Sequence, residues 1–221
     1  MHDQKTCYIL GASPDIAPLP NPSTGDCVIA ADGGRAAASR LGIVPELSVG
    51  DFDSLGCVPE GDGVVRLPVM KDETDSACAL RMALARGCER ILLFGCTGGR
   101  PDHTFANYLL LAQACLQAEV WMFGDGYAVT CLAPGKLCLS AALSGTVSVF
   151  ALGEPACGVA ERGLLYTLEG ANLSPLDPLG VSNSLTGQEA EISLSRGRLL
   201  VFIELCGRSA EELLSHVRRE R

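Results

Sequence analysis

The stretch ELSVGDFDSL, residues 46–55, joins a short apolar run to two aspartates that are one residue apart. The run at residues 47–49 has the composition of a short buried strand. In an open parallel sheet, ligands bind beyond the carboxyl ends of the strands. The stretch therefore predicts a strand of such a sheet and, directly after it, one edge of a ligand site.

Apolar runs of the same kind recur along roughly the first 125 residues and alternate with helical segments. The expected strands are residues 7–11, 27–31, 47–49, 64–67 and 91–95. The alanine-rich segment 34–41 is expected to be a helix. Strands that alternate with helices indicate a mainly parallel sheet that is covered on both faces.

Two further helices are expected in the same region. Thr74 or Asp72 is available as the N-cap of the first, whose apolar face holds Ala77, Leu80 and Leu84. The second would begin after Asp102 or Thr104. Its apolar face is expected to hold Phe105, Leu109, Ala112 and Leu116.

The pattern changes after about Gly126. Short β-rich runs follow at residues 145–152, 163–170, 189–194 and 198–205, separated by Gly, Pro, Ser and Asn. Such runs without amphipathic helices predict an antiparallel β-sandwich or a small barrel. The expected organisation is an α/β domain at 1–125, a β-sandwich domain at 126–207 and a helical tail at 208–221.

Composition limits the class of protein. The chain has 221 residues and a net charge of -9, which argues against nucleic acid as a partner because phosphate backbones select basic faces. No signal peptide and no apolar run long enough to cross a bilayer are evident in the sequence. The eleven cysteines never form CxxC and are expected to be small core residues rather than disulfides or zinc ligands. A soluble cytoplasmic protein is the natural expectation.

Four polar clusters follow the expected strands: ADGGR at 31–35, GDFDS at 50–54, KDETD at 71–75 and GCTGGRPDH at 95–103. A single cluster of aspartate and glycine usually marks only a turn or a helix cap. Four clusters at one edge of a sheet favour a site instead, because the carboxyl ends of parallel strands lie together.

The carboxylates predict a metal site. Asp51, Asp53 and Asp75 would raise one another's pKa if they met without a counter-charge, and a divalent cation removes that repulsion. Mg²⁺ accepts carboxylates while it keeps places for water and phosphate oxygens. Asp51 and Asp53 would point the same way if the segment is extended, and Phe52 would then pack in the core.

The glycines and cations fit an anionic ligand. Gly33 and Gly34, and likewise Gly98 and Gly99, would let the backbone approach an anion and present N–H groups at a helix start. Arg100 and Lys71 suit phosphate oxygens, although both could be ordinary surface charges. His103 could cap a helix or bind a phosphate. No GxxxxGK[ST] and no GxGxxG motif occurs, which argues against a P-loop enzyme and against a dinucleotide-binding fold. The acidic and cationic residues fit phosphoryl-type transfer, in which the protein mainly positions groups and neutralises charge.

With these motifs in hand, the sequence resembles the thiamine pyrophosphokinase (thiamine diphosphokinase) family over nearly its whole length. The motifs that carry the resemblance are ADGG at 31–34, GIVPELSVGDFDSL at 42–55, KDETD at 71–75, GGRPDH at 98–103 with AN at 106–107, and VSN at 181–183. The family's fold is a nucleotide-binding α/β domain followed by a β-sandwich domain.

The resemblance implies transfer of a diphosphate from ATP to thiamine, with Mg²⁺ on Asp51, Asp53 and Asp75. It further implies an ATP site, a thiamine site at Ser182 and Asn183, and a homodimer in which the sandwich of one chain completes the pocket of the other. The ATP site would comprise Asp32, Gly33, Gly34, Lys71, Thr74, Thr97, Arg100 and His103. Asp102 or Asp72 could accept the proton of the attacking hydroxyl, and both remain candidates.

Two other interpretations remain open on the residues alone. DFD at 51–53 could be the metal motif of a nucleotide-sugar glycosyltransferase, which leaves KDETD and GGRPDH unexplained. A catalytically silent nucleotide sensor would also fit the α/β domain. Such a binder has no need of carboxylates that repel phosphate.

Overall fold

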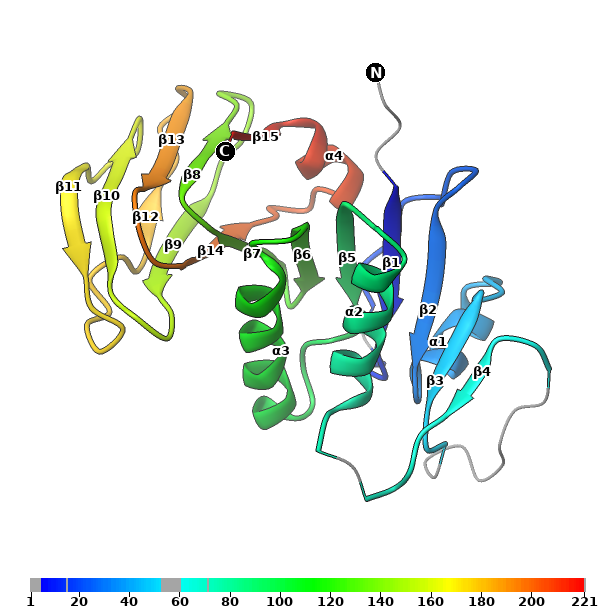
Figure 1. Ribbon diagram of the computed structural model, residues 1–221. Helices are drawn as coiled ribbons and strands as arrows, with labels where there is room; N and C mark the ends of the chain where they lie inside the picture. The colour runs from blue at the N-terminus through cyan, green and yellow to red at the C-terminus, as the bar shows by residue number, and fades with distance from the viewer. Residues whose placement is uncertain (1–4, 15, 53–60, 71, 221) are drawn as a thin grey trace. The chain divides into compact units, whose positions relative to one another are not determined.

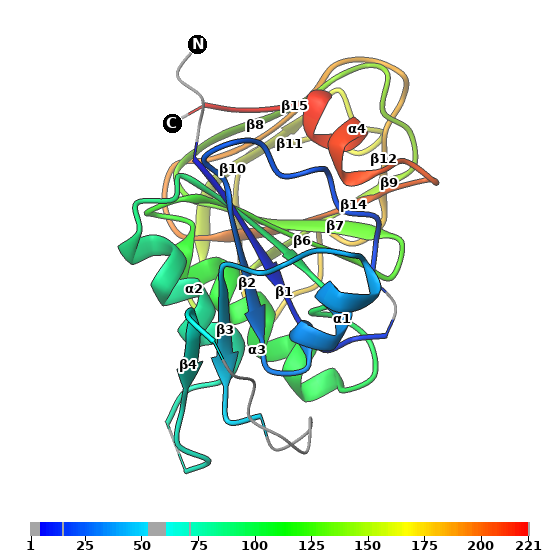
Figure 2. The same cartoon turned by 90° about the vertical axis from the view of Figure 1, so that its right-hand side faces the viewer.

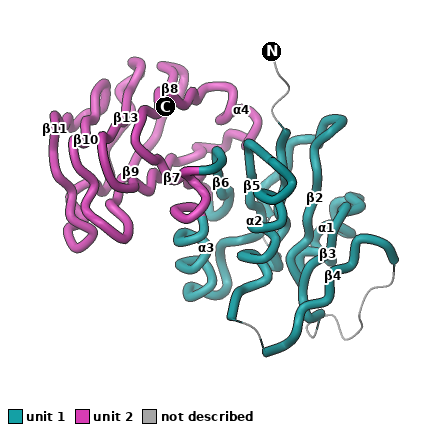
Figure 3. The backbone as a smooth tube through the Cα atoms, viewed as in Figure 1, with its two compact units in different colours: residues 1–110, 117–125 teal, residues 111–116, 126–221 magenta. Residues whose placement is uncertain are grey.

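The structure is a computed structural model that describes residues 5–14, 16–52, 61–70 and 72–220. The chain divides into two compact units (Figure 3). Unit 1 comprises residues 1–110 and 117–125, and unit 2 comprises residues 111–116 and 126–221. None of the helices that the structure describes is both long enough and apolar enough to cross a membrane.

Unit 1 contains a parallel sheet (Figure 1). Its strands are β1 (Thr6–Leu10), β2 (Cys27–Ala31), β3 (Leu47–Gly50), β4 (Val64–Arg66), β5 (Arg90–Phe94) and β6 (Glu119–Gly124). They are ordered β6-β5-β1-β2-β3-β4, and neighbouring strands in this order pair in parallel. The five strands expected from the sequence are confirmed to within about one residue at each end, and β6 was not foreseen.

Three helices belong wholly or partly to unit 1: α1 (Gly34–Arg40), α2 (Asp75–Ala85) and α3 (Pro101–Ala114). Helices α1 and α2 pack on β1 and β2 (Figure 2). Every residue of these two strands is buried, so both faces of the sheet are covered there, as predicted. Gly34 lets the start of α1 lie close against the end of β1, because a Cβ at position 34 would collide with the carbonyl oxygen of Leu10.

The expected apolar face of α3 is wrong except at Ala112, which is buried. Phe105, Leu109 and Leu116 are each about half exposed, at 58%, 45% and 54%. The buried positions of this segment include Asn107, Leu110, Leu111 and Ala114 instead. The segment is apolar on several sides, so helical periodicity alone fits more than one face.

Unit 2 is built from antiparallel strands: β7 (Tyr127–Leu132), β8 (Gly135–Leu139), β9 (Thr146–Ala151), β10 (Ala156–Arg162), β11 (Leu168–Leu173), β12 (Asn183–Ser184), β13 (Ala190–Leu194), β14 (Leu199–Glu204) and β15 (Val217–Glu220). Two series of neighbours occur, β12-β9-β14-β7 and β11-β10-β13-β8-β15. Neighbouring strands in both series pair antiparallel, which confirms the antiparallel arrangement predicted for this part of the chain. In β9 and β13 buried residues alternate with half-buried ones, as in sheets with one face on a core.

Two segments of unit 2 differ from the expectation. The run at 163–170 is not one strand, because only its last residues belong to β11. The tail contains α4 (Ala210–Ser215), whose start is closed by a capping box between Ser209 and Glu212. The chain then returns as β15 beside β8, a strand that the sequence did not predict.

Candidate functional site

A cavity of about 610 Å³ lies at the carboxyl ends of β1, β2, β3 and β5 in unit 1. This volume is typical of a pocket for a small ligand. Residues that follow these strands line the cavity, together with the first turns of α2 and α3. Sequence-predicted residues that line it are Asp32, Asp51, Thr74, Asp75, Gly98, Gly99, Thr97, Arg100 and His103.

Acidic side chains reach this cavity from three elements. Asp32 follows β2, Asp51 follows β3 and Asp75 is the first residue of α2. Asp75 lies in the first turn of α2, at the positive end of the helix dipole. Asp53, the third predicted metal ligand, lies outside the described residues. The structure therefore brings two members of the predicted metal set to one cavity.

The backbone after β3 is not extended. Phe52 has a φ of 60°, a left-handed conformation that is rare and strained for a bulky residue. The condition under which Asp51 and Asp53 were expected to point the same way, an extended segment, is therefore not met at Phe52. Phe52 itself is buried in the core, with 2% of its surface exposed, as expected.

The turn after β2 is held by backbone hydrogen bonds. Asp32, with a φ of 45°, donates its N–H to the carbonyl oxygen of Val49 at 2.7 Å and accepts the N–H of Arg35 at 3.1 Å. Gly33 and Gly34 are not among the residues that line the cavity. A Cβ on Gly33 would lie 2.8 Å from the Cβ of Ala12, so this glycine permits close packing.

Helix α2 starts with a side-chain cap. Thr74 is extended at its N-cap, and its Oγ1 accepts the N–H of Ala77 at 3.1 Å. Of the two predicted caps, the structure thus selects Thr74. Asp72 is exposed and does not line the cavity, and Lys71 is not among the residues that the structure describes.

The loop between β5 and α3 contributes the polar wall. Gly98 and Gly99 have φ values of 77° and 66°, which their missing side chains allow. Thr97 is buried beside Gly124, where a Cβ would collide with its hydroxyl oxygen. Asn107 was not singled out as a site residue, although the AN pair after GGRPDH was a signal. It lines the cavity and donates its Nδ2 to the carbonyl oxygen of Cys96 at 2.8 Å.

Arg100 and Asp102 form an exposed ion pair, with Nη2 and Oδ2 2.6 Å apart. The hydrogen bond from Arg100 lowers the pKa of the Asp102 carboxyl. Asp102 is not among the residues that line the cavity, whereas Arg100 is. The guanidinium is thus placed at the edge of the site with a counter-charge that an anionic ligand would have to replace.

In unit 2, Ser182 and Asn183 have different surroundings. Ser182 is exposed, has a φ of 59° and donates its N–H to the hydroxyl of Ser148 at 2.9 Å. Asn183 is buried, and its Nδ2 donates to Glu161 at 2.7 Å and to the carbonyl oxygen of Tyr166 at 2.6 Å. Its Oδ1 accepts the N–H groups of Tyr166 and Ser184, each at 2.9 Å.

The amide of Asn183 therefore fixes the backbone of Tyr166 on both sides. Tyr166 is 68% exposed, so its ring is accessible to a ligand. Sequence reasoning missed Tyr166 because it lay in a run that was expected to be a strand. Glu161, which accepts a hydrogen bond from Asn183, is only 2% exposed. Burial raises the pKa of its carboxyl, and the hydrogen bond from Asn183 acts in the opposite direction.

Comparison with known proteins gives two family matches. Residues 23–122 match the family described as "Thiamin pyrophosphokinase, catalytic domain". Residues 138–199 match "Thiamin pyrophosphokinase, vitamin B1 binding domain". Together these segments cover most of the chain and fall largely within unit 1 and wholly within unit 2, respectively.

Individual relatives agree. The thiamine pyrophosphokinase of Bacillus subtilis (strain 168) is 25% identical, with 79% of this chain and 85% of that protein covered. A crystal structure of the Bacillus subtilis protein has a TM-score of 0.80 at 24% identity, over 90% of this chain and 99% of that one. The thiamin pyrophosphokinase of Geobacillus thermodenitrificans has a TM-score of 0.76 at 27% identity, over 90% and 97%.

Proposed function

Because the chain belongs to the thiamin pyrophosphokinase family, we propose that it transfers a diphosphate group from ATP to the hydroxyl of thiamine, giving thiamine diphosphate and AMP. The observation that carries this proposal is the cavity in unit 1. It gathers carboxylates, a guanidinium and a glycine loop at the carboxyl edge of a parallel sheet. That edge is where open α/β sheets bind ligands.

The carboxylates fit a hard divalent cation. Asp51 and Asp75 offer oxygen ligands from two different elements to one cavity, and Mg²⁺ prefers such ligands. We assign Mg²⁺ to these two residues and to Asp53. Once bound, Mg²⁺ supplies charge neutralisation for the phosphate oxygens.

The remaining polar residues of the cavity suit the nucleotide. Arg100 can offer its planar fork to phosphate oxygens in exchange for Asp102. We also assign Asp32, Thr74, Thr97 and His103 to the ATP site, since all four line the same cavity. Gly33, Gly34 and Lys71 also belong to the proposed ATP site. The two glycines are assigned because they stand at the start of α1, and Lys71 because it is the first residue of the KDETD motif.

We place thiamine at the segment that contains Ser182 and Asn183. Ser182 offers an exposed hydroxyl, and Asn183 holds the segment through its buried amide. Tyr166 provides an exposed aromatic face beside them, and aromatic faces attract cations such as the thiazolium ring of thiamine. We propose a homodimer in which this segment of one subunit serves the cavity of the partner.

In the proposed reaction the thiamine hydroxyl oxygen attacks the β-phosphorus of ATP in line. A new O–P bond forms, the bond from the β-phosphorus to the bridging oxygen of AMP breaks, and AMP leaves with that electron pair. The transition state is loose, so orientation matters more than a strong base. Asp102 or Asp72, both exposed carboxylates, accepts the hydroxyl proton late.

The test is to incubate the protein with ATP, Mg²⁺ and thiamine and to separate the nucleotides that result. The proposal predicts AMP and thiamine diphosphate in equal amounts, and AMP only when thiamine is present. ADP as the product would mean an ordinary kinase, and no nucleotide turnover would mean a binder. Either of these results would contradict the proposal.

A further inference from the structure

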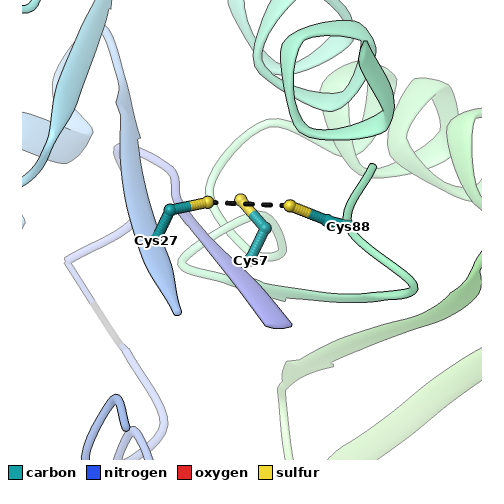
Figure 4. Close-up of side chains that lie close together, drawn as sticks. All are labelled: Cys7, Cys27 and Cys88. Atoms are coloured by element: carbon teal, nitrogen blue, oxygen red, sulfur yellow. Dashed lines mark hydrogen bonds between the residues drawn. The ribbon is translucent and has the colours of Figure 1, made fainter. Parts of the chain in front are cut away.

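Three buried cysteines come together at the amino ends of strands in unit 1. Cys7 is the second residue of β1, and Cys27 is the first residue of β2. The two are register partners in neighbouring parallel strands. Cys88 lies between α2 and β5, two residues before β5 begins. Figure 4 shows the three side chains directed toward one another.

This thiol cluster (Cys7, Cys27 and Cys88) is separate from the ATP cavity. The cavity is at the carboxyl ends of the strands, whereas the cluster lies at their amino ends. None of its members lines the cavity. The proposed phosphoryl transfer therefore makes no use of these three thiols.

The geometry is that of a small coordination site. The three sulfurs lie within 4.8 Å of one another, and those of Cys27 and Cys88 are 3.8 Å apart. A metal ion with three thiolates at about 2.3 Å in a plane separates its sulfurs by about 4.0 Å. The cluster thus needs little movement to surround an ion.

We propose that Cys7, Cys27 and Cys88 bind one soft, thiophilic metal ion in three-coordinate geometry, with Cu(I) as its representative. Thiolate sulfur selects soft ions over hard ones. In the part of the chain that the structure describes, no histidine, carboxylate or further cysteine joins this group. Zn²⁺ sites normally have four ligands, so a three-sulfur site favours Cu(I).

Two acidic residues adjoin the cluster in sequence, Asp26 and Glu89. Glu89 is exposed and is not part of the group of close ligand atoms, and Asp26 is already engaged. Asp26, which precedes Cys27, accepts the N–H of Thr6 at 3.0 Å through Oδ1 and the N–H of Ser23 at 2.8 Å through Oδ2. Both oxygens therefore hold backbone in place. This engagement supports a site of sulfur alone.

Two cations help to balance the negative charge of bound thiolates. Lys5 donates its Nζ to the carbonyl oxygen of Arg86 at 3.0 Å, which places it at the connection that carries Cys88. Arg86 lies on the same connection, two residues before Cys88. Each thiol that binds the ion releases its proton to solvent, and the ion would tie β1, β2 and the α2–β5 connection together.

The test is a titration of the reduced full-length protein with Cu(I) in the absence of oxygen, in competition with the chelator bathocuproine disulfonate. Wild type is expected to compete for Cu(I), and X-ray absorption should show three sulfurs at about 2.3 Å. Cys27→Ala should weaken the affinity on the order of a hundredfold. Cys88→Ala, outside the strands, provides the same test if Cys27→Ala does not fold.

Two matched controls separate this site from other thiols. Cys78→Ala removes a thiol of similar burial from α2, and Cys115→Ala removes one of the interacting pair Cys115 and Cys131 in unit 2. Both should keep wild-type affinity at the three-sulfur site. Unchanged affinity in Cys27→Ala and Cys88→Ala, equal losses in the controls, or two-sulfur coordination would each overturn the proposal.

Discussion

Asp51 links the fold to the proposed chemistry most directly, because the end of β3 places this residue at the cavity. It follows β3, is half-buried and lines the cavity in which the metal ion is proposed to bind. We expect Asp51→Asn to fold normally and to lose turnover on the order of a hundredfold or more, as charge-stabilising groups do.

The measurement for Asp51→Asn is the rate of AMP formation at several Mg²⁺ concentrations, with circular dichroism as the check on folding. Asp62→Asn, an exposed residue of the same unit, is the matched control and should keep wild-type turnover. Near-normal turnover of Asp51→Asn at low Mg²⁺ would exclude Asp51 as a metal ligand.

Glu161 makes stability depend on pH. Burial raises the pKa of its carboxyl in the folded protein, so the folded state binds more protons than the unfolded state, whose glutamates titrate at about 4.3. The stabilising effect is complete below that unfolded pKa and is lost as pH rises through the folded pKa. In Glu161→Gln the side chain cannot ionise, so this variant should not lose stability in this way as pH rises.

The measurement for Glu161→Gln is urea unfolding of both proteins between acid and neutral pH. The free energy of unfolding of the variant, minus that of wild type, should increase as pH rises above about 4. Gln can still accept the hydrogen bond of Asn183 through its carbonyl oxygen. Parallel curves for the two proteins would contradict the assignment.

At the residue scale, much of the cavity could be predicted from the sequence, because strand ends and polar clusters are local features. The left-handed backbone of Phe52 could not, since nothing local distinguishes it from an extended residue. The hydrogen-bond partners of Asn183 could not be predicted from the sequence either. Its partners Tyr166 and Glu161 lie 17 and 22 residues away, and only the folded chain brings them together.

Among the elements, α2 has the clearest link between local structure and the site. Its N-cap, Thr74, and its first residue, Asp75, both line the cavity. Loss of a capping hydroxyl typically costs about 1 kcal/mol. Thr74→Ala should therefore lower the free energy of unfolding by about that amount and lower turnover as well, because the first turn that carries Asp75 loosens.

Urea unfolding and the AMP assay together check this prediction. Thr74→Ser keeps the hydroxyl that accepts the N–H of Ala77 and should restore most of both quantities. If Thr74→Ala and Thr74→Ser behave alike, the cap is not what positions the start of α2.

Elements with a strong local signal were predictable, such as β1 and β2, whose residues are all buried. Elements decided by distant contacts were not. Which face of α3 is buried depends on the side that packs against the rest of the fold. The tail forms β15 because it pairs with β8, which is distant in sequence. The stretch around Tyr166 is apolar like a strand, but its backbone is held by Asn183 instead.

At the scale of the whole molecule, the change in sequence pattern near residue 126 reflects two different kinds of sheet. A parallel sheet needs helices between its strands, whereas an antiparallel one needs only turns, and both patterns are local. The division of α3 is not local. Residues 111–116 group with unit 2, and no sequence pattern marks that boundary.

The proposed homodimer predicts complementation between subunits. Asp51→Asn damages the proposed cavity in unit 1, and Tyr166→Ala damages the proposed thiamine segment in unit 2. If each site uses both subunits, a mixed dimer has one intact site, and random mixing should restore about a quarter of wild-type turnover. The AMP assay after co-refolding measures it, and no gain over the separate variants contradicts a shared site.

The central claim is that Asp51 and Asp75 bind a divalent cation together with the triphosphate of ATP. The most direct measurement is a crystal structure with Mg²⁺ and the α,β-methylene analogue of ATP, in which the bond to be broken is blocked. The account predicts one cation in contact with both carboxylates and with phosphate oxygens. A triphosphate bound elsewhere, or carboxylates turned away from the cation, would contradict it.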